Sequence, residues 1–360
     1  MTYELLSSDG AARRGRVHTT RGSYETPVFM PVGTRGAVVH LDARDYESLG
    51  AEVVLGNTYH LMLRPGADVI EGFGGLHGFT SWDGHMLTDS GGFQVMSLSP
   101  EIDDDGVTFT SVYDGSKARL TPESATHVQE QLGADIAMVL DICPALPATP
   151  REVRQAMETT HRWAERAHAA HTRSDQAQFG IVQGGVDPEM RIESARVLAD
   201  IGFPGYGIGG LSVGEPRGQM LPALEAALSE LPSDVPRYLM GVGDPVSIVE
   251  AIALGVDMFD CVLPTRLARH GTVLTSRGRV NLRNAKFERV GDPLDERNPF
   301  SNNFAAGYLR HLLKVKEPTA GRILTQHNIW YLFDLVARTR RAIDAGTLQQ
   351  VRDEVAECWD

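Results

Sequence analysis

The chain has 360 residues, of which 42% are hydrophobic, and a formal net charge of −13 at pH 7. This length suits one α/β domain of about 250 residues with insertions. No apolar run approaches ~18 residues, so we expect no membrane span, and the start at Met1 lacks a basic and apolar leader, which predicts a cytoplasmic protein. Cys143, Cys261 and Cys358 are too widely spaced for a disulfide framework or a Cys-rich zinc site.

Eight short apolar segments recur along the chain. Continuous runs of this kind are typical of strands buried on both faces. The segments are residues 28–32, 53–57, 86–89, 136–141, 179–183, 205–210, 238–242 and 258–263.

Helix-start signals follow several of these segments. Thr149-Pro150 with Glu152 is a capping box, and Thr121-Pro122, Asp187-Pro188 and Asp244-Pro245 combine an N-cap residue with a proline at the first helical position. Alternation of eight strands with helices predicts a (β/α)8 TIM barrel in the α/β class, with a doubly wound sheet as the alternative.

Two insertions interrupt this single predicted domain of residues 1–360. Residues 98–120 alternate around Asp105-Gly106 and Asp114-Gly115, which predicts a hairpin. Residues 266–325, named here the basic subdomain, follow the eighth strand. Between Arg266 and Arg322 they carry twelve Lys or Arg against five acids. A basic patch on an acidic protein suits a polyanion partner, and an ordinary solvated face is the alternative.

Polar residues stand at the carboxyl ends of the predicted strands, which in a barrel share one mouth. They are Asn57, Asp89, Asp141, Gln183, Gly209-Gly210 and Asp260. Asp260 lies in an apolar run, where a carboxylate is tolerated only if it is paired or functional. A convergence of this kind predicts one shared site.

No phosphate-binding loop accompanies these residues. Two carboxylates allow attack at a sugar carbon by one and proton transfer by the other. Asp141 and Gln183 suit the donor and acceptor edge of a purine, and the Gly209-Gly210 backbone can approach a base closely. Phe93 and Met240 are candidates for stacking on its two faces.

Several long motifs resemble the tRNA-guanine transglycosylase family, and the similarity runs from about residue 3 to the C-terminus. The motifs are Leu55-Gly56-Asn57-Thr58-Tyr59-His60-Leu61, Leu87-Thr88-Asp89-Ser90-Gly91-Gly92-Phe93-Gln94-Val95, Gln183-Gly184, Gly209-Gly210-Leu211-Ser212-Val213-Gly214-Glu215, Tyr238-Leu239-Met240-Gly241-Val242-Gly243 and Asp257-Met258-Phe259-Asp260-Cys261-Val262-Leu263-Pro264-Thr265-Arg266.

The resemblance implies that guanine at the wobble position of certain tRNAs is replaced by a 7-deazaguanine without a cofactor. Asp260 becomes the nucleophile on the ribose C1′, and Asp89 the proton acceptor. The implied base-binding residues are Ser90, Gly91, Gly92, Phe93, Asp141, Cys143, Gln183, Gly209, Gly210, Leu211, Val213, Glu215 and Met240. Val213 and Cys143 match the bacterial pattern, which implies the aminomethyl precursor preQ1 as the incoming base.

The same resemblance implies contacts with the anticodon loop. The residues concerned are Gly241, Val242, Gly243, Asp244, Pro245, Val246, Ser247, Thr265, Arg266, Leu267, Ala268 and Arg269. The family forms dimers, and the sequence leaves a homodimer open.

Two positions depart from the family. A zinc site of the pattern C-x-C-x-x-C followed by a His is replaced by residues 295–303, which contain no cysteine, so that only His327 remains at a ligand position. One His cannot hold structural zinc, which takes about four ligands, and we expect no metal. Ile142 stands where bacterial members carry Glu, which removes a charge beside Asp141. A DNA or other-RNA 7-deazaguanine transglycosylase and a non-catalytic tRNA-binding partner subunit are the alternative functions.

Overall fold

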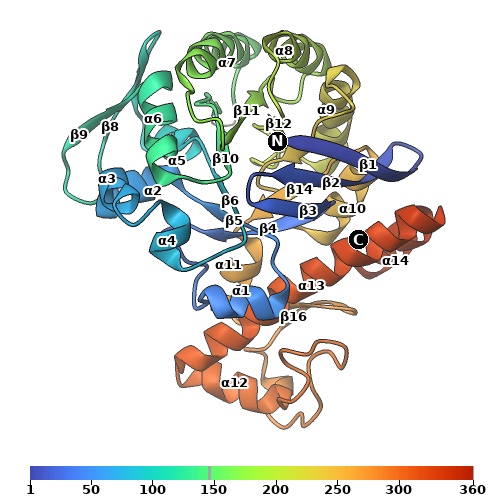
Figure 1. Cartoon of the computed structure of the whole chain (residues 1–360). Helices are drawn as coiled ribbons and strands as arrows, with labels where there is room; N and C mark the ends of the chain where they lie inside the picture. The colour runs from blue at the N-terminus through green and yellow to red at the C-terminus, as the bar shows by residue number, and fades with distance from the viewer. Residues whose placement is uncertain (145–146, 360) are drawn as a thin grey trace.

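The predicted barrel is present in the computed structural model, which describes residues 1–144 and 147–359. Its eight strands close in the order β10-β11-β12-β13-β14-β4-β5-β6, and every neighbouring pair with a resolved register is parallel. The (β/α)8 prediction is therefore confirmed (Figure 1). The strands are β4 Val28–Gly33, β5 Val53–Gly56, β6 His85–Thr88, β10 Ile136–Met138, β11 Ala177–Val182, β12 Tyr206–Ile208, β13 Arg237–Leu239 and β14 Met258–Cys261.

Helices between the strands begin where the sequence signals predicted. The side chains of Thr121, Thr149, Asp187 and Asp244 cap the backbone of their helices, each with proline at the first position. The helices that follow β4 to β14 are α1 Ala43–Leu49, α2 Thr58–Leu61, α3 Ala67–Glu71, α4 Leu76–Thr80, α5 Gly92–Met96, α6 Pro122–Leu132, α7 Pro150–Ala170, α8 Pro188–Ile201, α9 Arg217–Glu230, α10 Pro245–Ala253 and α11 Leu263–Arg269.

An antiparallel sheet that the sequence reading did not predict lies at the amino ends of the barrel strands. It consists of β1 Thr2–Asp9, β2 Ala12–Thr19 and β3 Gly22–Thr26. Arg13 of β2 pairs with Asp257, directly before β14, and Arg21 pairs with Asp135, directly before β10, at 3.0 Å. This sheet therefore covers the end of the barrel opposite the carboxyl ends of the strands.

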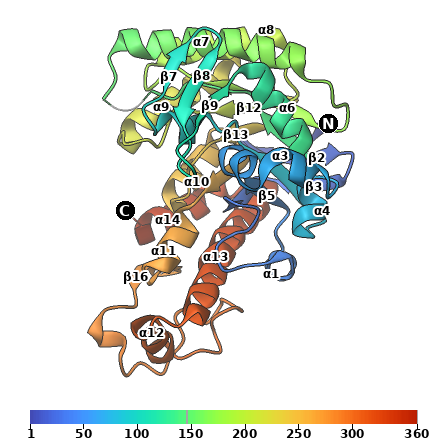
Figure 2. The same cartoon turned by 90° about the vertical axis from the view of Figure 1, so that its left-hand side faces the viewer.

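Residues 98–120 form a three-stranded antiparallel sheet beside α6 and α7 (Figure 2). Its strands are β7 Glu101–Asp103, β8 Gly106–Thr110 and β9 Lys117–Leu120. The acidic residues at its β7–β8 turn face arginines of α7: Asp104 pairs with Arg162 at 2.9 Å. The turn is thus tied to the neighbouring helix and not only solvated.

The basic subdomain extends away from the barrel beside the long helix α13 (Figures 1 and 2). Its own small core contains Leu282, Leu309 and Leu324, all fully buried. Its elements are β15 Thr272–Thr275, β16 Gly278–Asn281, η2 Ala285–Phe287, α12 Ala306–Lys314 and the first turns of α13 Pro318–Ala345. Helix α14 Leu348–Trp359 follows α13. None of the described helices combines the length and apolarity that crossing a membrane requires.

Candidate active site

Asp260 lies on β14 with its two carboxylate oxygens in different situations. Oδ1 accepts hydrogen bonds from the Tyr238 hydroxyl at 2.6 Å and from the Gly241 N–H at 2.7 Å. No donor among the described residues contacts Oδ2. Burial raises the pKa of Asp260, while these two hydrogen bonds lower it. One oxygen is therefore held in place and the other is left available to attack a substrate.

Asp89 follows β6 and is buried among donors. Its Oδ1 accepts from the backbone N–H groups of Thr58 at 2.8 Å and Gly91 at 3.2 Å, and its Oδ2 accepts from Gln94 Nε2 at 3.0 Å and from Asn57 Nδ2. Burial outweighs these bonds and raises the pKa of Asp89 to about 6, with the negative charge of Asp260 adding to the rise. A carboxyl group with such a pKa can both give and accept a proton near neutral pH.

Asp141 is the centre of a second group. Ser90 Oγ donates to its Oδ1 at 2.9 Å, and Gln183 Nε2 donates to its Oδ2 at 2.7 Å. A Cβ on Gly92 would lie 2.7 Å from the Asp141 carbonyl, and one on Gly209 would lie 2.8 Å from Gln183 Nε2. The glycines are needed there because the backbone passes these polar groups too closely for a side chain.

Four other predicted base-binding residues, Cys143, Leu211, Val213 and Glu215, closely follow Asp141 and Gly210 in the chain. Cys143 is buried and lines a cavity of about 690 Å³ beside Ile142. The backbone N–H of Val213 donates to Glu215 at 3.0 Å, and Leu211 is buried. These residues come from separate loops after β10 and β12.

The two candidate stacking residues differ in exposure. Phe93 on the short helix α5 is 60% exposed. Met240 is half-buried, and its sulfur would lie 3.1 Å from a Cβ on Gly207. Gly210 has a positive φ of 66°. A Cβ added at Gly210 would lie only 2.4 Å from Gln183 Oε1, so the backbone of Gly210 packs directly against the Gln183 amide. Met240 and Gly210 thus belong to the inner wall, and Phe93 belongs to the surface.

Ile142 does not face the Asp141 carboxylate group. Its side chain is buried in an apolar cluster with Tyr59, Val95 and Trp163. Its backbone N–H donates to the Thr160 hydroxyl at 3.0 Å. The substitution therefore extends the packing between the barrel and α7.

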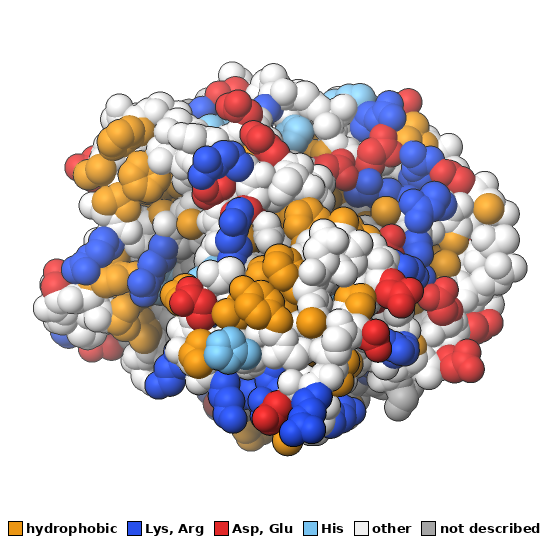
Figure 3. All heavy atoms as spheres, turned by 90° about the horizontal axis from the view of Figure 1, so that it is seen from below, with side chains coloured by type: hydrophobic (Ala, Val, Ile, Leu, Met, Phe, Trp, Pro, Cys, Tyr) orange, Lys and Arg blue, Asp and Glu red, His pale blue; other side chains and the backbone are white. Residues whose placement is uncertain are grey.

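Only three of the twelve predicted RNA-binding residues are exposed: Gly241, Arg266 and Arg269. The residues Val242, Gly243, Pro245, Val246, Ser247, Thr265 and Ala268 are buried, and Asp244 and Leu267 are half-buried. Asp244 and Ser247 form the N-cap of α10, with a hydrogen bond of 2.9 Å. Figure 3 shows Lys and Arg side chains in several groups on the end of the molecule that carries the basic subdomain, interspersed with acidic ones.

His327 on α13 is fully buried, and both of its ring nitrogens are engaged. Nδ1 lies 2.7 Å from Ser301 Oγ, and Nε2 lies 2.8 Å from the Leu274 carbonyl. Asn298 Nδ2 donates to the His327 carbonyl at 3.0 Å. Across residues 1–144 and 147–359, no three His, Cys, Asp or Glu side chains gather as metal ligands. Zinc does not fit this set, because the partners of the His327 ring are a hydroxyl and a backbone carbonyl, and structural zinc takes thiolate, imidazole or carboxylate ligands.

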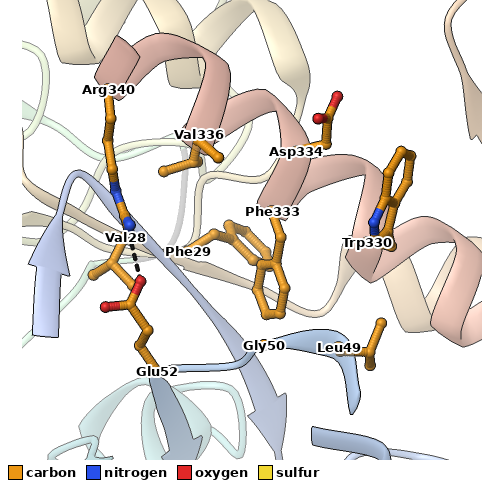
Figure 4. A pocket seen from close by; sticks show the side chains of 11 residues that line it. Val28, Phe29, Leu49, Gly50, Glu52, Trp330, Phe333, Asp334, Val336 and Arg340 are labelled. Atoms are coloured by element: carbon orange, nitrogen blue, oxygen red, sulfur yellow. Dashed lines mark hydrogen bonds and ion pairs between the residues drawn. The ribbon is translucent and has the colours of Figure 1, made fainter. Parts of the chain in front are cut away.

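A separate cavity of about 290 Å³ lies between α13 and the start of β4 (Figure 4). Phe29, Trp330 and Phe333 line it, and Arg340 pairs with Glu52 across one side at 2.8 Å. Its lining comes from α13, the start of β4 and the segment before β5, and it includes none of the residues predicted for the site. It is not part of the candidate site.

Three residues at the site had no predicted role. Tyr238 and Gln94 hold the two carboxylates, and Arg191 on α8 is completely buried behind Gln183. Tyr238 and Gln94 lie within the family-like motifs, which is a signal that could have identified them. Arg191 carries no such signal, since its position on a helix suggests a solvated residue.

The fold and the site together define a (β/α)8-barrel enzyme with two hydrogen-bonded carboxylates in its mouth. A family model described as queuine tRNA-ribosyltransferase matches residues 8–360. Queuine tRNA-ribosyltransferases of Herpetosiphon aurantiacus and Moorella thermoacetica are 52% and 51% identical, covering 98% and 100% of this chain and 91% and 98% of their own. The chain belongs to the queuine tRNA-ribosyltransferase family and is a pentosyltransferase.

Proposed function

We propose that this protein replaces guanine at the wobble position of tRNA with a 7-deazaguanine, preQ1, through a covalent Asp260–ribosyl intermediate. The observation that carries the proposal is the Asp260 carboxylate, with Oδ1 held by Tyr238 and Gly241 and Oδ2 free, beside the buried Asp89. Membership of the family supports tRNA as the substrate.

In the first half-reaction, Asp260 Oδ2 forms a bond to C1′ of the ribose as the bond from C1′ to guanine N9 breaks. The electron pair stays on N9, and Asp89 in its acid form supplies the proton. In the second, Asp89 takes the N9 proton of the incoming base, whose nitrogen attacks C1′ and releases Asp260. Two displacements on one carbon retain its configuration.

The base is recognised by complementary hydrogen-bonding groups. The Asp141 carboxylate accepts from the purine N1 and N2 donors, and Gln183 Nε2 with the Gly210 N–H donates to O6. Burial raises the pKa of Asp141, and its bonds to Gln183 and Ser90 oppose that rise. Val213 and Cys143 form the part of the wall that selects the small aminomethyl group of preQ1 by limiting bulk.

The tRNA is held near the carboxyl end of β14. Arg266 and Arg269 are exposed on α11, directly after the strand that carries Asp260. Guanidinium groups there can neutralise phosphates that flank the wobble nucleotide. The basic subdomain extends this positive surface, and we propose that it folds without zinc through the hydrogen bonds of Ser301, Asn298 and His327.

The decisive experiment incubates the full-length protein with radiolabelled guanine and a tRNA that carries a GUN anticodon. We expect label to enter the tRNA, and a covalent protein–RNA adduct to be trapped. Asp260→Asn removes the nucleophile, so both signals should disappear while tRNA binding persists. Asp234→Asn, at an exposed position, is the matched control and should behave as the wild type.

Other outcomes discriminate between the alternatives. Label entering duplex DNA in preference to tRNA would assign the chemistry to DNA. Tight tRNA binding without label or adduct would make the protein a non-catalytic partner subunit. An adduct that persists in Asp260→Asn would remove Asp260 from the nucleophile position.

A further inference from the structure

Arg191 is a fully buried cation behind the proposed purine-edge site. It lies in the first turn of α8, and its guanidinium packs against the end of β11 and the loop that follows it. Nε donates to the Gly185 carbonyl at 2.8 Å and Nη1 to the Val182 carbonyl at 2.9 Å. Nη2 has no hydrogen-bond partner, and Arg191 forms no ion pair within the described part of the chain.

The unpartnered Nη2 is close to the Gly210 backbone, 3.5 Å from the position of an added Cβ. Gln183 Oε1 is 2.4 Å from the same position, and it too is buried without a donor. Gln183 and Gly210 are the proposed donors to the purine O6. The positive charge of Arg191 is thus next to the end of the pocket where O6 lies in the proposed complex.

An unpaired buried charge is expensive, so proteins usually pair such groups or place them at functional sites. Arg191 cannot lose its proton at neutral pH. Its two backbone hydrogen bonds satisfy part of the guanidinium, and Glu215 is near enough to favour the charged form without forming an ion pair with it. A negative charge that develops on a bound substrate is a natural complement.

We propose that Arg191 is a positioning residue that stabilises negative charge on the departing purine. This inference rests on the proposed base exchange. When the C1′–N9 bond breaks, the electron pair on N9 is delocalised through the ring toward O6. The Arg191 cation, behind Gln183 and Gly210, stabilises the negative charge that reaches O6. It also keeps the N–H groups of Gln183 and Gly210 directed at O6, and it does not contact the base itself.

The expected size of the effect follows from Coulomb's law. A unit charge at about 6 Å and an effective permittivity of about 20 lowers the barrier enough for roughly a 100-fold rate effect. Because the negative charge is spread over the purine, the rate effect is smaller than this value for a full unit charge. We therefore expect Arg191→Met to slow covalent adduct formation by about 10- to 100-fold.

The test measures single-turnover adduct formation with saturating tRNA, and tRNA affinity separately. Arg191→Met should lower the rate and leave the tRNA dissociation constant unchanged, and Arg191→Lys should recover most of the rate because it keeps the charge. Arg196→Met is the matched control: Arg196 is on the same helix but exposed, paired with Glu230 at 2.9 Å, and its loss should change neither quantity.

A second readout separates an electrostatic role from a purely structural one. The wobble guanine of a synthetic anticodon stem-loop is replaced by 8-azaguanine, whose N9 anion is more stable. The defect of Arg191→Met should shrink with this leaving base. An equal defect with both bases, a rate as fast as wild type, or a loss confined to tRNA affinity would overturn the inference. If the wild type and Arg196→Met form no adduct, the proposed function itself fails instead.

Discussion

The barrel mouth and the basic subdomain keep their polar side chains buried in different ways. In the mouth, Asp89 and Asp260 stand where the family resemblance implies them, and both backbone and side-chain donors hold their carboxylates. In the basic subdomain, Ser301 and the Leu274 carbonyl occupy the surroundings of His327, where the family has a metal site. The difference indicates that the reaction depends on particular atoms, whereas the subdomain needs only a folded surface.

We expect the largest effect on activity from a substitution in the barrel mouth, at Asp89. Asp89→Asn removes the group that transfers the N9 proton, and we expect the base-exchange rate to fall by about 10²- to 10⁴-fold. The rate of covalent adduct formation by the wild type should decline above a pH of about 6, because the pKa of Asp89 is raised to that value and only its acid form supplies the proton to N9. Asp83→Asn, which changes an exposed side chain, should retain wild-type activity and the same decline above pH 6.

The raised pKa of Asp89 also predicts how stability changes with pH. A carboxyl group whose folded pKa lies above its unfolded value stabilises the protein most below about pH 4, and this contribution is lost as pH rises through about 6. The rise to about 6 corresponds to roughly 3 kcal/mol. The unfolding free energy of Asp89→Asn, measured in urea, should therefore fall less steeply between pH 4 and 7 than that of the wild type. Parallel curves would contradict the pKa shift.

The next prediction concerns the basic subdomain at His327. His327→Ala removes both ring hydrogen bonds and leaves a buried cavity, so we expect a loss of about 2 to 4 kcal/mol in unfolding free energy. Ser301→Ala removes one bond and should lose about 1 kcal/mol. A chelator should leave the melting temperature of the wild type unchanged.

Calorimetric melts with and without chelator, together with metal analysis of the purified protein, check this prediction. His311→Ala on the exposed face of α12 is the control and should melt as the wild type. One zinc per chain, removed by the chelator with a lower melting temperature, would show that the subdomain depends on metal.

The smallest effect is expected where the two regions adjoin, at Arg266 and Arg269. Each arginine changed to Ala should weaken tRNA binding and reduce the slope of log affinity against log salt by about one unit per lost phosphate contact. The change should be similar for all tRNA sequences, because phosphate contacts carry no sequence information. Binding titrations at several salt concentrations, with Arg341→Ala as control, measure it. An unchanged slope would place both arginines outside the interface.

The barrel could be predicted from local signals. All eight predicted strand segments are barrel strands, because a strand buried on both faces must be apolar along its whole length. The capped starts of α6, α7, α8 and α10 depend only on neighbouring residues. The β1–β3 sheet was missed because its outer strand, β1 Thr2–Asp9, is largely exposed and has no clear apolar pattern. The strand is ordered by packing against the end of the barrel.

At the candidate site, the sequence predicted which residue types gather at the strand ends, and the structure decided how each atom is used. Asp89, Asp141, Gln183 and Asp260 are recognisable because polar residues ending apolar strands must meet in a barrel mouth. Asp260 Oδ2 is left free because Oδ1 is held by Tyr238 on β13 and by the backbone N–H of Gly241, which follows that strand.

The sequence by itself determined the class of fold, the polar residues that end its strands and the loss of the cysteine ligands, because each depends on residue type and local spacing. Only the tertiary structure decided that Arg191 is buried without an ion pair among the described residues, that most of the predicted RNA-binding residues are covered, and that Ser301 and Leu274 hold His327. These properties depend on which elements pack together, and contacts between residues distant in the chain leave no local pattern.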